Sequence, residues 1–301
     1  MKQLLLAVVL ACVGCPPYAL AQKIVAHPAA TVRVPDEAFD ASFAAAKAGM
    51  LSLKSAAALV IDQIENRVLY AKNVEAVHPV ASITKLMTAI VVLDSGGPLD
   101  EQVTISEADV DDIKHTRSRL KVGTVLTRAD LLRLALMASE NRAAAALARA
   151  HPGGTRAFVA AMNQKAVELN MWHTRFVDGT GLSSDNVSTA QDLAQMVNAA
   201  YRYPLIREFT TTSAHAIILS NGRLLQYRNS NGLVRNSSWS IGLSKTGYIS
   251  EAGRCLVMQS SIASKPVVIV LLDSWGRNTR LGDANRIKKW VESLFSRQPA
   301  G

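Results

Sequence analysis

Three short stretches of the sequence combine residue types that can carry out acyl transfer. They are Ser82-Ile83-Thr84-Lys85, Ser139-Glu140-Asn141 and Lys245-Thr246-Gly247. A serine hydroxyl becomes a strong nucleophile when a neighbouring base takes its proton, and a lysine can be that base when its pKa is lowered. The three stretches therefore predict a serine nucleophile, a lysine general base and a second cation beside them.

Single copies of such motifs carry little weight. About one Ser-x-x-Lys and about one Ser-x-Asn are expected by chance in a chain of this composition. Further copies indeed occur at Ser118-Arg119-Leu120-Lys121 and at Ser184-Asp185-Asn186. Lys-Thr-Gly is rarer, with about 0.04 copies expected. The stretch that begins at Ser118 is polar, and we predict that it is surface chain.

The residues after Ser82 distinguish it from the second copy. The run 86–93 is apolar on nearly all sides, which predicts a buried helix with Ser82 near its N-terminus. The Ser82 hydroxyl would then lie near the positive end of the helix dipole, with Lys85 one turn further on the same face. Burial and the charge of Lys245 are both expected to lower the pKa of Lys85.

Strand patterns occupy both ends of the chain beyond residue 50. The expected strands are 58–61, 67–70, 216–219, 224–227, 241–248, 254–258 and 267–272. Asn221-Gly222 is expected to be the turn of one hairpin. Lys245 lies between Gly242 and Gly247, where the lack of a side chain is expected to let the backbone of a ligand approach closely.

The middle of the chain has helical patterns. Thr127 with Asp130, and Ser188 with Gln191, form capping boxes that predict two helix starts. Another helix is expected to end near Asn170. The last apolar residues recur at helical spacing and predict a helix that packs on a sheet: Ile287, Trp290, Val291, Leu294 and Phe295. These patterns predict an α/β (α+β) fold in which both chain ends build one sheet, flanked by a helical middle region.

The composition excludes several classes of protein. The 301 residues are 49% hydrophobic and 19% charged, enough to bury a core, which excludes a disordered chain and a disulfide-stapled miniprotein. A net charge of +9 suits nucleic acid, an anionic membrane or an acidic substrate as partner. Aromatic residues are only 5% and no basic stripe is visible, so nucleic acid is not an expected partner.

The first residues have the pattern of an export signal. Lys2 precedes the apolar run 4–11, and Ala19-Leu20-Ala21 is a small-x-small cleavage pattern. The apolar run is far shorter than the ~20 residues that cross a bilayer, so no transmembrane segment is expected in the mature chain. Lipidation at Cys15 is the alternative to cleavage after Ala21.

These signals predict three regions. We expect a signal peptide over 1–21, a lead-in segment over 22–50 with a helix near 44–46, and a catalytic domain over 51–297. Cleavage after Ala21 would leave Cys255 as the single cysteine, in an apolar run that predicts a buried structural thiol. The expected location is the periplasm.

Longer stretches around the three motifs make the chain resemble a known family. From about residue 57 to the C-terminal helix it resembles the low-molecular-mass penicillin-binding proteins, and among them the D-alanyl-D-alanine endopeptidases of the penicillin-binding protein 7 type. The stretches that carry the resemblance are 80–88, 136–143 and 243–256. The resemblance implies a β-lactamase/transpeptidase-like fold with a mainly antiparallel sheet.

The resemblance also implies chemical roles. Ser82 would attack the carbonyl of a D-alanyl peptide bond, and Lys85 would take its proton. Ser139 would relay a proton to the leaving amine, while Asn141 would hold Lys85 and an amide of the substrate. Water would then release the acyl-enzyme.

The third motif is implied to bind the substrate. Lys245 and Thr246 would bind the carboxylate beside the scissile bond, and Gly247 would line the site. The backbone N–H groups of Ser82 and Tyr248 would form the oxyanion hole. The expected substrates are the D-alanyl cross-links and stem peptides of peptidoglycan, with β-lactams as covalent inhibitors and no metal or cofactor.

Three alternatives stay open. D-alanyl-D-alanine carboxypeptidases share the motifs, but they commonly carry a further β-rich domain for which few residues follow Gly247. A class A β-lactamase would need Glu-x-x-Leu-Asn, whereas the segment 166–170 reads Ala-Val-Glu-Leu-Asn and predicts a helix end. A non-catalytic wall-binding module is disfavoured by the intact Ser82 and Lys85.

Overall fold

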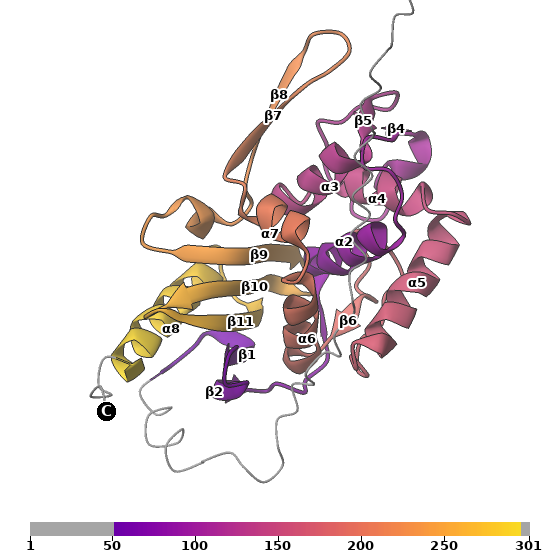
Figure 1. The fold of residues 1–301 in the computed structure, drawn as a ribbon. Coiled ribbons are helices and arrows are strands. Elements are labelled where there is room, and N and C mark those ends of the chain that lie inside the picture. Colours follow the sequence, from indigo (N-terminus) through magenta and orange to yellow (C-terminus); the bar gives the residue numbers. More distant parts are fainter. Residues whose placement is uncertain (1–50, 296–301) are drawn as a thin grey trace, which may run out of the picture. The chain divides into compact units, whose positions relative to one another are not determined.

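The computed structural model describes residues 51–295, and a five-stranded antiparallel sheet organises them (Figure 1). The strand order is β2-β1-β11-β10-β9. The strands are β1 Ser55–Asp62, β2 Arg67–Lys72, β9 Ser240–Ile249, β10 Gly253–Ile262 and β11 Lys265–Ser274. The predicted α/β (α+β) fold, with its sheet built from both ends, is therefore confirmed.

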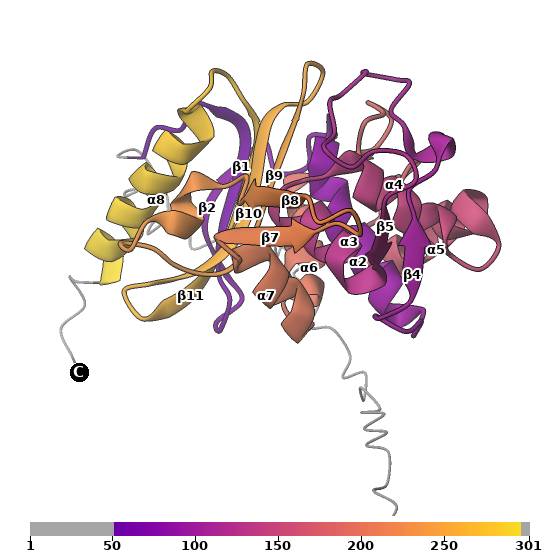
Figure 2. The same ribbon diagram turned by 90° about the horizontal axis from the view of Figure 1, so that it is seen from above.

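Helices cover both faces of the sheet (Figure 2). On one face, α8 (Thr279–Phe295) buries Ile287 and Val291 against strand residues such as Val60. On the other face, the neighbouring strand residue Leu59 joins the core of the helical region. Because both faces are covered, successive strand residues are buried in turn, which explains the uninterrupted apolar runs in the sequence.

The helical region lies between β2 and β9 in sequence. Its helices are α2 Lys85–Asp94, α3 Arg128–Met137, α4 Asn141–Arg149, α5 Gly154–Glu168, α6 Ala190–Ala200 and α7 Pro204–Thr211. Short 3₁₀ segments are η1 Ala81–Thr84, η2 Glu107–Asp109 and η3 Gly232–Arg235. Three small strand pairs join β3 His78–Pro79 to β6 Val187–Ser188, β4 Gln102–Thr104 to β5 Val125–Thr127, and β7 Ala214–Ile218 to β8 Leu224–Arg228.

One predicted helix start is confirmed and the other is wrong. Thr127 caps α3, since its Oγ1 accepts a hydrogen bond of 3.0 Å from the Asp130 N–H. Helix α6 is capped by Thr189, which accepts a bond of 3.1 Å from the Asp192 N–H, and not by Ser188. A Thr-x-x-Asp box one residue later satisfies the same rule, so the sequence contained two overlapping candidates.

Other expectations are met, with one omission. The β7–β8 hairpin turns at Asn221-Gly222, where Gly222 has a φ of 77°. Cys255 is fully buried, as predicted. Helix α7 is not among the predicted elements; Pro204 occupies its first turn, where a proline needs no hydrogen bond from its nitrogen. The predicted signal peptide, the helix near 44–46 and Cys15 lie outside the described residues.

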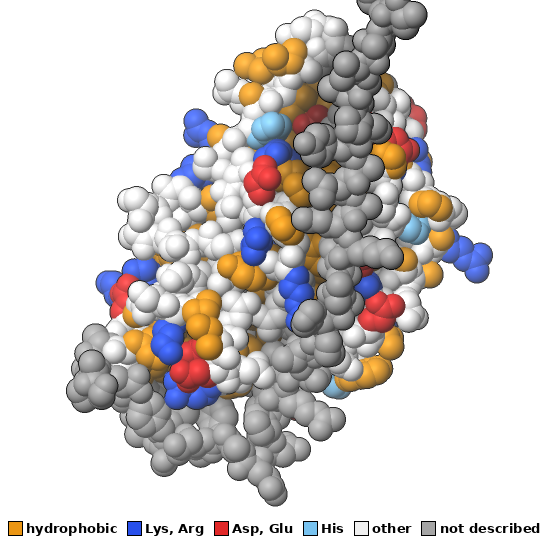
Figure 3. All heavy atoms as spheres, in the orientation of Figure 1, with side chains coloured by type: hydrophobic (Ala, Val, Ile, Leu, Met, Phe, Trp, Pro, Cys, Tyr) orange, Lys and Arg blue, Asp and Glu red, His pale blue; other side chains and the backbone are white. Residues whose placement is uncertain are grey.

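Two further observations concern the surface. Within residues 51–295, no helix combines the length and the apolar character needed to cross a membrane. On the face shown in Figure 3, Lys and Arg side chains are dispersed among polar and apolar ones and form no extended stripe.

Candidate functional site

The turn that carries Ser82 is clamped by two glycines. Ser82 lies in η1, directly before α2, as the sequence predicted. A Cβ at Gly181 would lie 2.0 Å from the Ala81 carbonyl oxygen, and a Cβ at Gly247 would lie 2.8 Å from the Val80 carbonyl oxygen. Such contacts are far inside van der Waals distance. Glycine is therefore required at both positions so that two separate segments can close on the Ser82 turn.

This arrangement corrects the interpretation of the glycines on β9. Gly247 admits the backbone before Ser82 and not that of a ligand. A Cβ at Gly242 would lie 2.2 Å from Oε1 of Gln259 and 2.8 Å from the ring of Tyr201. Both glycines thus make room for this protein's own chain. The close approach at Gly247 also places β9 beside Ser82, since a Cβ there would lie 3.3 Å from the Ser82 nitrogen.

Lys85 is fully buried and held by three oxygens. Its Nζ lies 2.8 Å from Ser82 Oγ, 2.7 Å from Asn141 Oδ1 and 2.6 Å from the Thr180 carbonyl oxygen. The amide and carbonyl oxygens can only accept hydrogen bonds. A neutral amine therefore keeps its two N–H groups on these oxygens and turns its lone pair toward the Ser82 hydroxyl.

The electrostatics of Lys85 suit a base near neutral pH. Burial lowers its pKa from the usual 10.5 to about 7, against the opposing negative charges of Asp178, Glu140 and Asp111. The prediction that burial lowers this pKa is confirmed, whereas the charge of Lys245 is not among the main causes of the shift at Lys85. The repulsion between the two lysines is seen at Lys245, where burial comes first and the charges of Lys85 and Arg280 further lower the pKa.

The second and third motifs meet each other. Ser139 follows α3 in a left-handed conformation, with a φ of 60°, and its Oγ accepts a bond of 2.8 Å from Nζ of Lys245. Lys245 also donates to the carbonyl oxygen of Thr246 at 2.9 Å. Thr246 Oγ1 donates to Ser230 Oγ at 2.7 Å, just beyond the end of β8. Ser-x-Asn, which is common by chance, and Lys-Thr-Gly, which is rare, are thus joined directly by a hydrogen bond.

Arg280 is a site residue that the sequence reasoning missed. It lies on α8, far from the three motifs in sequence, and its guanidinium donates to the Gly247 carbonyl oxygen at 2.9 Å. Its Nε is buried without a partner among the described residues. No spacing signal pointed to it, because the contact depends on how α8 packs on the sheet.

Tyr248 follows Gly247 on β9, and its side chain lies at the surface. The side chain is 56% exposed, and the Arg254 guanidinium carbon lies 4.3 Å from the ring centroid. The Tyr248 backbone follows Gly247, which packs against the Ser82 turn. The role of the Tyr248 N–H in an oxyanion hole stays a prediction.

The loop around Asp178 positions the carbonyl that holds Lys85. Asp178 Oδ1 accepts bonds from the N–H and hydroxyl of Thr180, at 2.5 and 2.6 Å, and from the Gly181 N–H at 2.6 Å. Asn186, fully buried, donates to the Asp178 carbonyl oxygen at 2.9 Å and to Thr84 Oγ1 at 3.0 Å. The second Ser-x-Asn copy therefore supports this loop through its asparagine.

Asn141 connects the site to a further loop. Its Oδ1 accepts from Lys85 and its Nδ2 donates to Thr116 Oγ1 at 3.0 Å. Asp111 fixes Thr116 by accepting from both its N–H and its hydroxyl, at 2.8 and 2.6 Å. Thr116 was not among the predicted site residues, since threonine in a polar loop has no distinguishing sequence signal.

The competing segments do not form a second site. Ser118 Oγ accepts from the Leu120 N–H at 3.0 Å, in an irregular segment where Lys121 is exposed, so the prediction of surface chain is confirmed. The segment 166–170 is a helix end, also as predicted, and Glu168 forms an ion pair of 2.7 Å with Lys165 there. Among residues 51–295, no group of three or more His, Cys, Asp or Glu side chains is arranged to hold a metal ion.

Comparison of the chain with known proteins identifies its family. The family model described as D-alanyl-D-alanine carboxypeptidase, peptidase S11, matches residues 42–276. The D-alanyl-D-alanine endopeptidase of Pseudomonas aeruginosa is 48% identical over 80% of this chain and 78% of its own length. That of Escherichia coli K12 is 45% identical over 83% of this chain and 81% of its own length.

Solved structures agree with the fold. The crystal structure of the Streptomyces K15 DD-transpeptidase superposes with a TM-score of 0.74 and 29% identity. The match covers 81% of this chain and 98% of that chain. The predicted β-lactamase/transpeptidase-like fold is confirmed by this similarity. The chain therefore belongs to peptidase family S11, the D-alanyl-D-alanine carboxypeptidase family of serine peptidases.

Proposed function

We propose that the protein is a serine D-alanyl-D-alanine endopeptidase that hydrolyses the D-alanyl cross-links of peptidoglycan. The observation that carries the proposal is the 2.8 Å contact between Ser82 Oγ and Nζ of a fully buried Lys85, whose pKa is lowered to about 7. The endopeptidase specificity is inferred from the relatives of Pseudomonas aeruginosa and Escherichia coli, which are both named D-alanyl-D-alanine endopeptidase.

The acylation step uses the two serines and Lys85. Ser82 Oγ attacks the carbonyl carbon of the D-alanyl residue while its proton passes to neutral Lys85, and the carbonyl electron pair moves to the oxygen. The N–H groups of Ser82 and Tyr248 stabilise this oxyanion, at ~3 kcal/mol per donor. When the C–N bond breaks, Ser139 relays the proton to the leaving amine. Asn141 keeps Lys85 in place throughout.

A cationic wall binds the other end of the scissile peptide. Lys245, Thr246 and Gly247 line it, and the Arg280 guanidinium lies against the Gly247 carbonyl. A substrate carboxylate next to the scissile bond would be attracted by the charge of Arg280 and would favour the protonated form of Lys245. Water then attacks the acyl carbon, which releases the acid product and returns the proton to Ser82.

β-Lactams present a strained amide carbonyl to the same nucleophile and are expected to acylate Ser82. The test is labelling with a fluorescent penicillin, with Ser118→Ala as the matched control because Ser118 belongs to the other Ser-x-x-Lys copy. We expect labelling of the wild type and of Ser118→Ala, and none of Ser82→Ala. An unlabelled wild type, or a labelled Ser82→Ala, would exclude the acyl-enzyme.

A D-alanyl-D-alanine carboxypeptidase is the second candidate, because the matching family model carries that description. Purified cross-linked dimers and uncross-linked pentapeptides separate the two activities. We expect dimers to be converted to monomers. Release of terminal D-alanine with intact dimers would identify a carboxypeptidase.

We also propose where the enzyme acts. Residues 1–21 would direct export and be removed, residues 22–50 would be a lead-in segment, and 51–297 would form the catalytic domain in the periplasm. The support is the short apolar run and the Ala19-Leu20-Ala21 pattern. N-terminal sequencing of the mature protein tests this, and a lipid-modified Cys15 would contradict it.

A further inference from the structure

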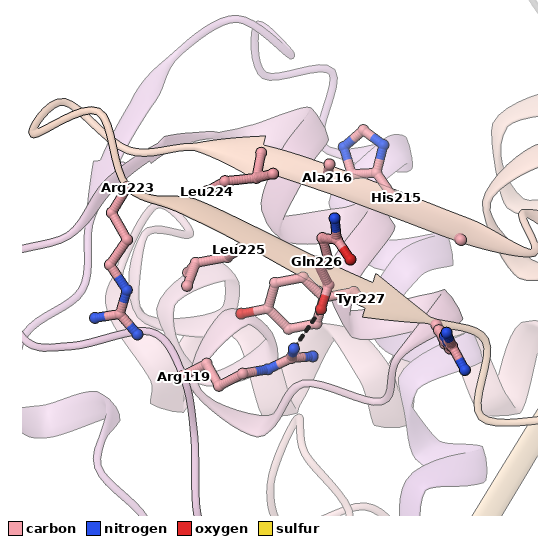
Figure 4. Close-up of a pocket in the computed structure, with 10 residues that line it drawn as sticks. Arg119, His215, Ala216, Arg223, Leu224, Leu225, Gln226 and Tyr227 are labelled. Carbon is pink, nitrogen blue, oxygen red and sulfur yellow. Dashed lines mark hydrogen bonds between the residues drawn. The ribbon is translucent and has the colours of Figure 1, made fainter.

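The β7–β8 hairpin forms one wall of a pocket that the proposed reaction does not use (Figure 4). The pocket has a volume of about 1070 Å³ and is lined by both strands and by Arg119. Figure 1 shows the hairpin projecting away from the sheet, above the helical region. The inner face of β8, with Leu225 and Tyr227, is anchored in the core.

The pocket is strongly basic. Arg119, Arg223 and Arg228 line it together with His215, which lies 3.7 Å from Asp130. Within the described part of the chain, Arg223 and Arg228 are exposed and take part in none of the ion pairs. These positive charges are available to an anionic ligand.

One of the cations is held in a fixed position. The Arg119 guanidinium carbon lies 3.8 Å from the centre of the Tyr227 ring, and the guanidinium also donates a hydrogen bond to the Gln226 carbonyl oxygen. Figure 4 shows Arg119 beneath the hairpin, with its guanidinium next to Tyr227 and its hydrogen bond to Gln226 drawn as a dashed line. A planar cation fixed in this way loses little conformational entropy when a carboxylate binds to it.

The Tyr227 hydroxyl is a second feature that suits an anionic ligand. Tyr227 is only 1% exposed, and its hydroxyl is buried without a hydrogen-bond partner among residues 51–295. Figure 4 shows this hydroxyl directed along the pocket toward the side on which Arg223 lies. An unpaired buried hydroxyl is costly, and an acceptor in the pocket would remove that cost.

Two short stretches of chain connect the pocket to residues that are bonded to the catalytic site. Arg228 is two residues from Ser230, which accepts from Thr246, and Arg119 is three residues from Thr116, which accepts from Asn141. At most ~3.6 Å of chain per residue separates these pairs, so both arginine backbones lie within ~11 Å of residues bonded to the site. A second peptide attached to the scissile one can reach this distance.

We propose that this pocket binds a carboxylate of the second stem peptide of a cross-linked substrate. The inference rests on the proposed endopeptidase function and deepens it. A cross-linked dimer carries a second peptide with its own carboxylates, whereas a single stem peptide or a penicillin does not. The pocket would therefore favour cross-linked over uncross-linked substrates without touching the reacting atoms.

The test compares an Arg223→Ala/Arg228→Ala double variant with Arg156→Ala. Arg156 is an exposed arginine on α5 that takes part in none of the ion pairs among residues 51–295, so it controls for the loss of surface charge. We expect the double variant to raise KM for a purified cross-linked dimer ~10-fold, since partly exposed charge pairs each contribute up to ~fivefold. The rates of penicillin acylation and the KM for a monomeric pentapeptide should stay within twofold.

Tyr227→Phe removes only the hydroxyl and keeps the ring that the Arg119 guanidinium contacts. It is expected to raise the dimer KM about threefold, with no loss in thermal stability. A dimer whose side carboxylates have been amidated should bind the wild type as weakly as it binds the double variant. Unchanged dimer KM in the double variant, or an equal loss with the monomer, would overturn the proposal.

Binding measured in a Ser82→Ala background separates this proposal from the proposed function. Dimer binding there needs no catalysis, so a charge-dependent loss of affinity in the double variant supports the pocket even if penicillin fails to label the wild type. Conversely, normal labelling together with charge-independent dimer binding retains the acyl-enzyme and rejects the pocket.

Discussion

Nζ of Lys245 donates a hydrogen bond of 2.8 Å to Oγ of Ser139, although the two residues are 106 positions apart in sequence. Lys245 lies on β9 of the sheet and Ser139 lies between α3 and α4 of the helical region. The bond therefore joins the two structural halves at the point where Lys85 and Ser82 also meet.

Replacing Ser139 by alanine should slow acylation by a fluorescent penicillin ~10²-fold, because a positioned proton relay contributes at least this much. The substitution keeps Cβ and so does not change the strain of the left-handed backbone at this position. Ser184→Ala, in the other Ser-x-Asn copy, is the matched control and should be unaffected. A rate for Ser139→Ala equal to that of the control would remove Ser139 from the mechanism.

The pH dependence of acylation should report Lys85. Because its pKa is lowered to about 7, the rate is expected to rise with pH and to reach half of its plateau near pH 7. The negative charge of Glu140 raises this pKa, so Glu140→Gln should move the midpoint to lower pH. Glu65→Gln, an exposed carboxylate paired with Lys265, should leave the midpoint in place. A midpoint that moves upward in Glu140→Gln contradicts this assignment.

The free energy of unfolding should also depend on pH because of Lys85. The folded-state pKa is below the usual 10.5, so the unfolded chain binds an additional proton between pH 7 and 10 and stability rises with pH there. Lys85→Met removes this contribution. The difference in unfolding free energy between wild type and Lys85→Met should change by ~1.4 kcal/mol per pH unit between pH 8 and 10.

Denaturant titrations at several pH values measure this difference. Lys289→Met replaces an exposed lysine and should show no such slope. If the difference in unfolding free energy between wild type and Lys85→Met were as independent of pH as that for Lys289→Met, Lys85 would titrate as an ordinary surface lysine.

Gly181 and Gly222 form a natural pair for testing the clamp on the Ser82 turn. Both have a φ of 77°, but a Cβ at Gly181 would lie 2.0 Å from the Ala81 carbonyl oxygen, whereas a Cβ at Gly222 meets nothing within 4 Å. Gly222→Ala should cost ~1 kcal/mol through backbone strain alone. Gly181→Ala should cost ~3 kcal/mol or more and abolish penicillin labelling. Equal costs in thermal denaturation would show that the clamp does not hold Ser82.

The sequence was informative wherever a local pattern set the structure. The apolar run after Lys85 predicted α2, and the rarity of Lys-Thr-Gly identified β9 as part of the site. The sequence was silent on the Thr180 carbonyl that holds Lys85, because any residue type offers a backbone carbonyl. Arg280 and Thr116 were missed because packing between distant segments alone brings them to the site.

The glycines on β9 show why a correct motif can still be misinterpreted. Small residues beside Lys245 indicated a close approach, but the sequence could not reveal the approaching group. The structure shows that Gly247 admits the Ser82 turn and that Gly242 admits Gln259 and Tyr201. A residue type can predict close packing without naming the partner.

The pairing of β1 with β11 has a consequence for how the chain folds. Ser55 lies opposite Ser274, so β1 pairs early with β2 but acquires its second neighbour, β11, only after nearly all of the domain has been synthesised. Until then, the β1–β2 hairpin presents an apolar open edge. Such late, long-range pairing slows folding and exposes intermediates to aggregation. Chains truncated before β11 should therefore require chaperones or be degraded. The Ser82 site can then be assembled only in chains that have completed the sheet.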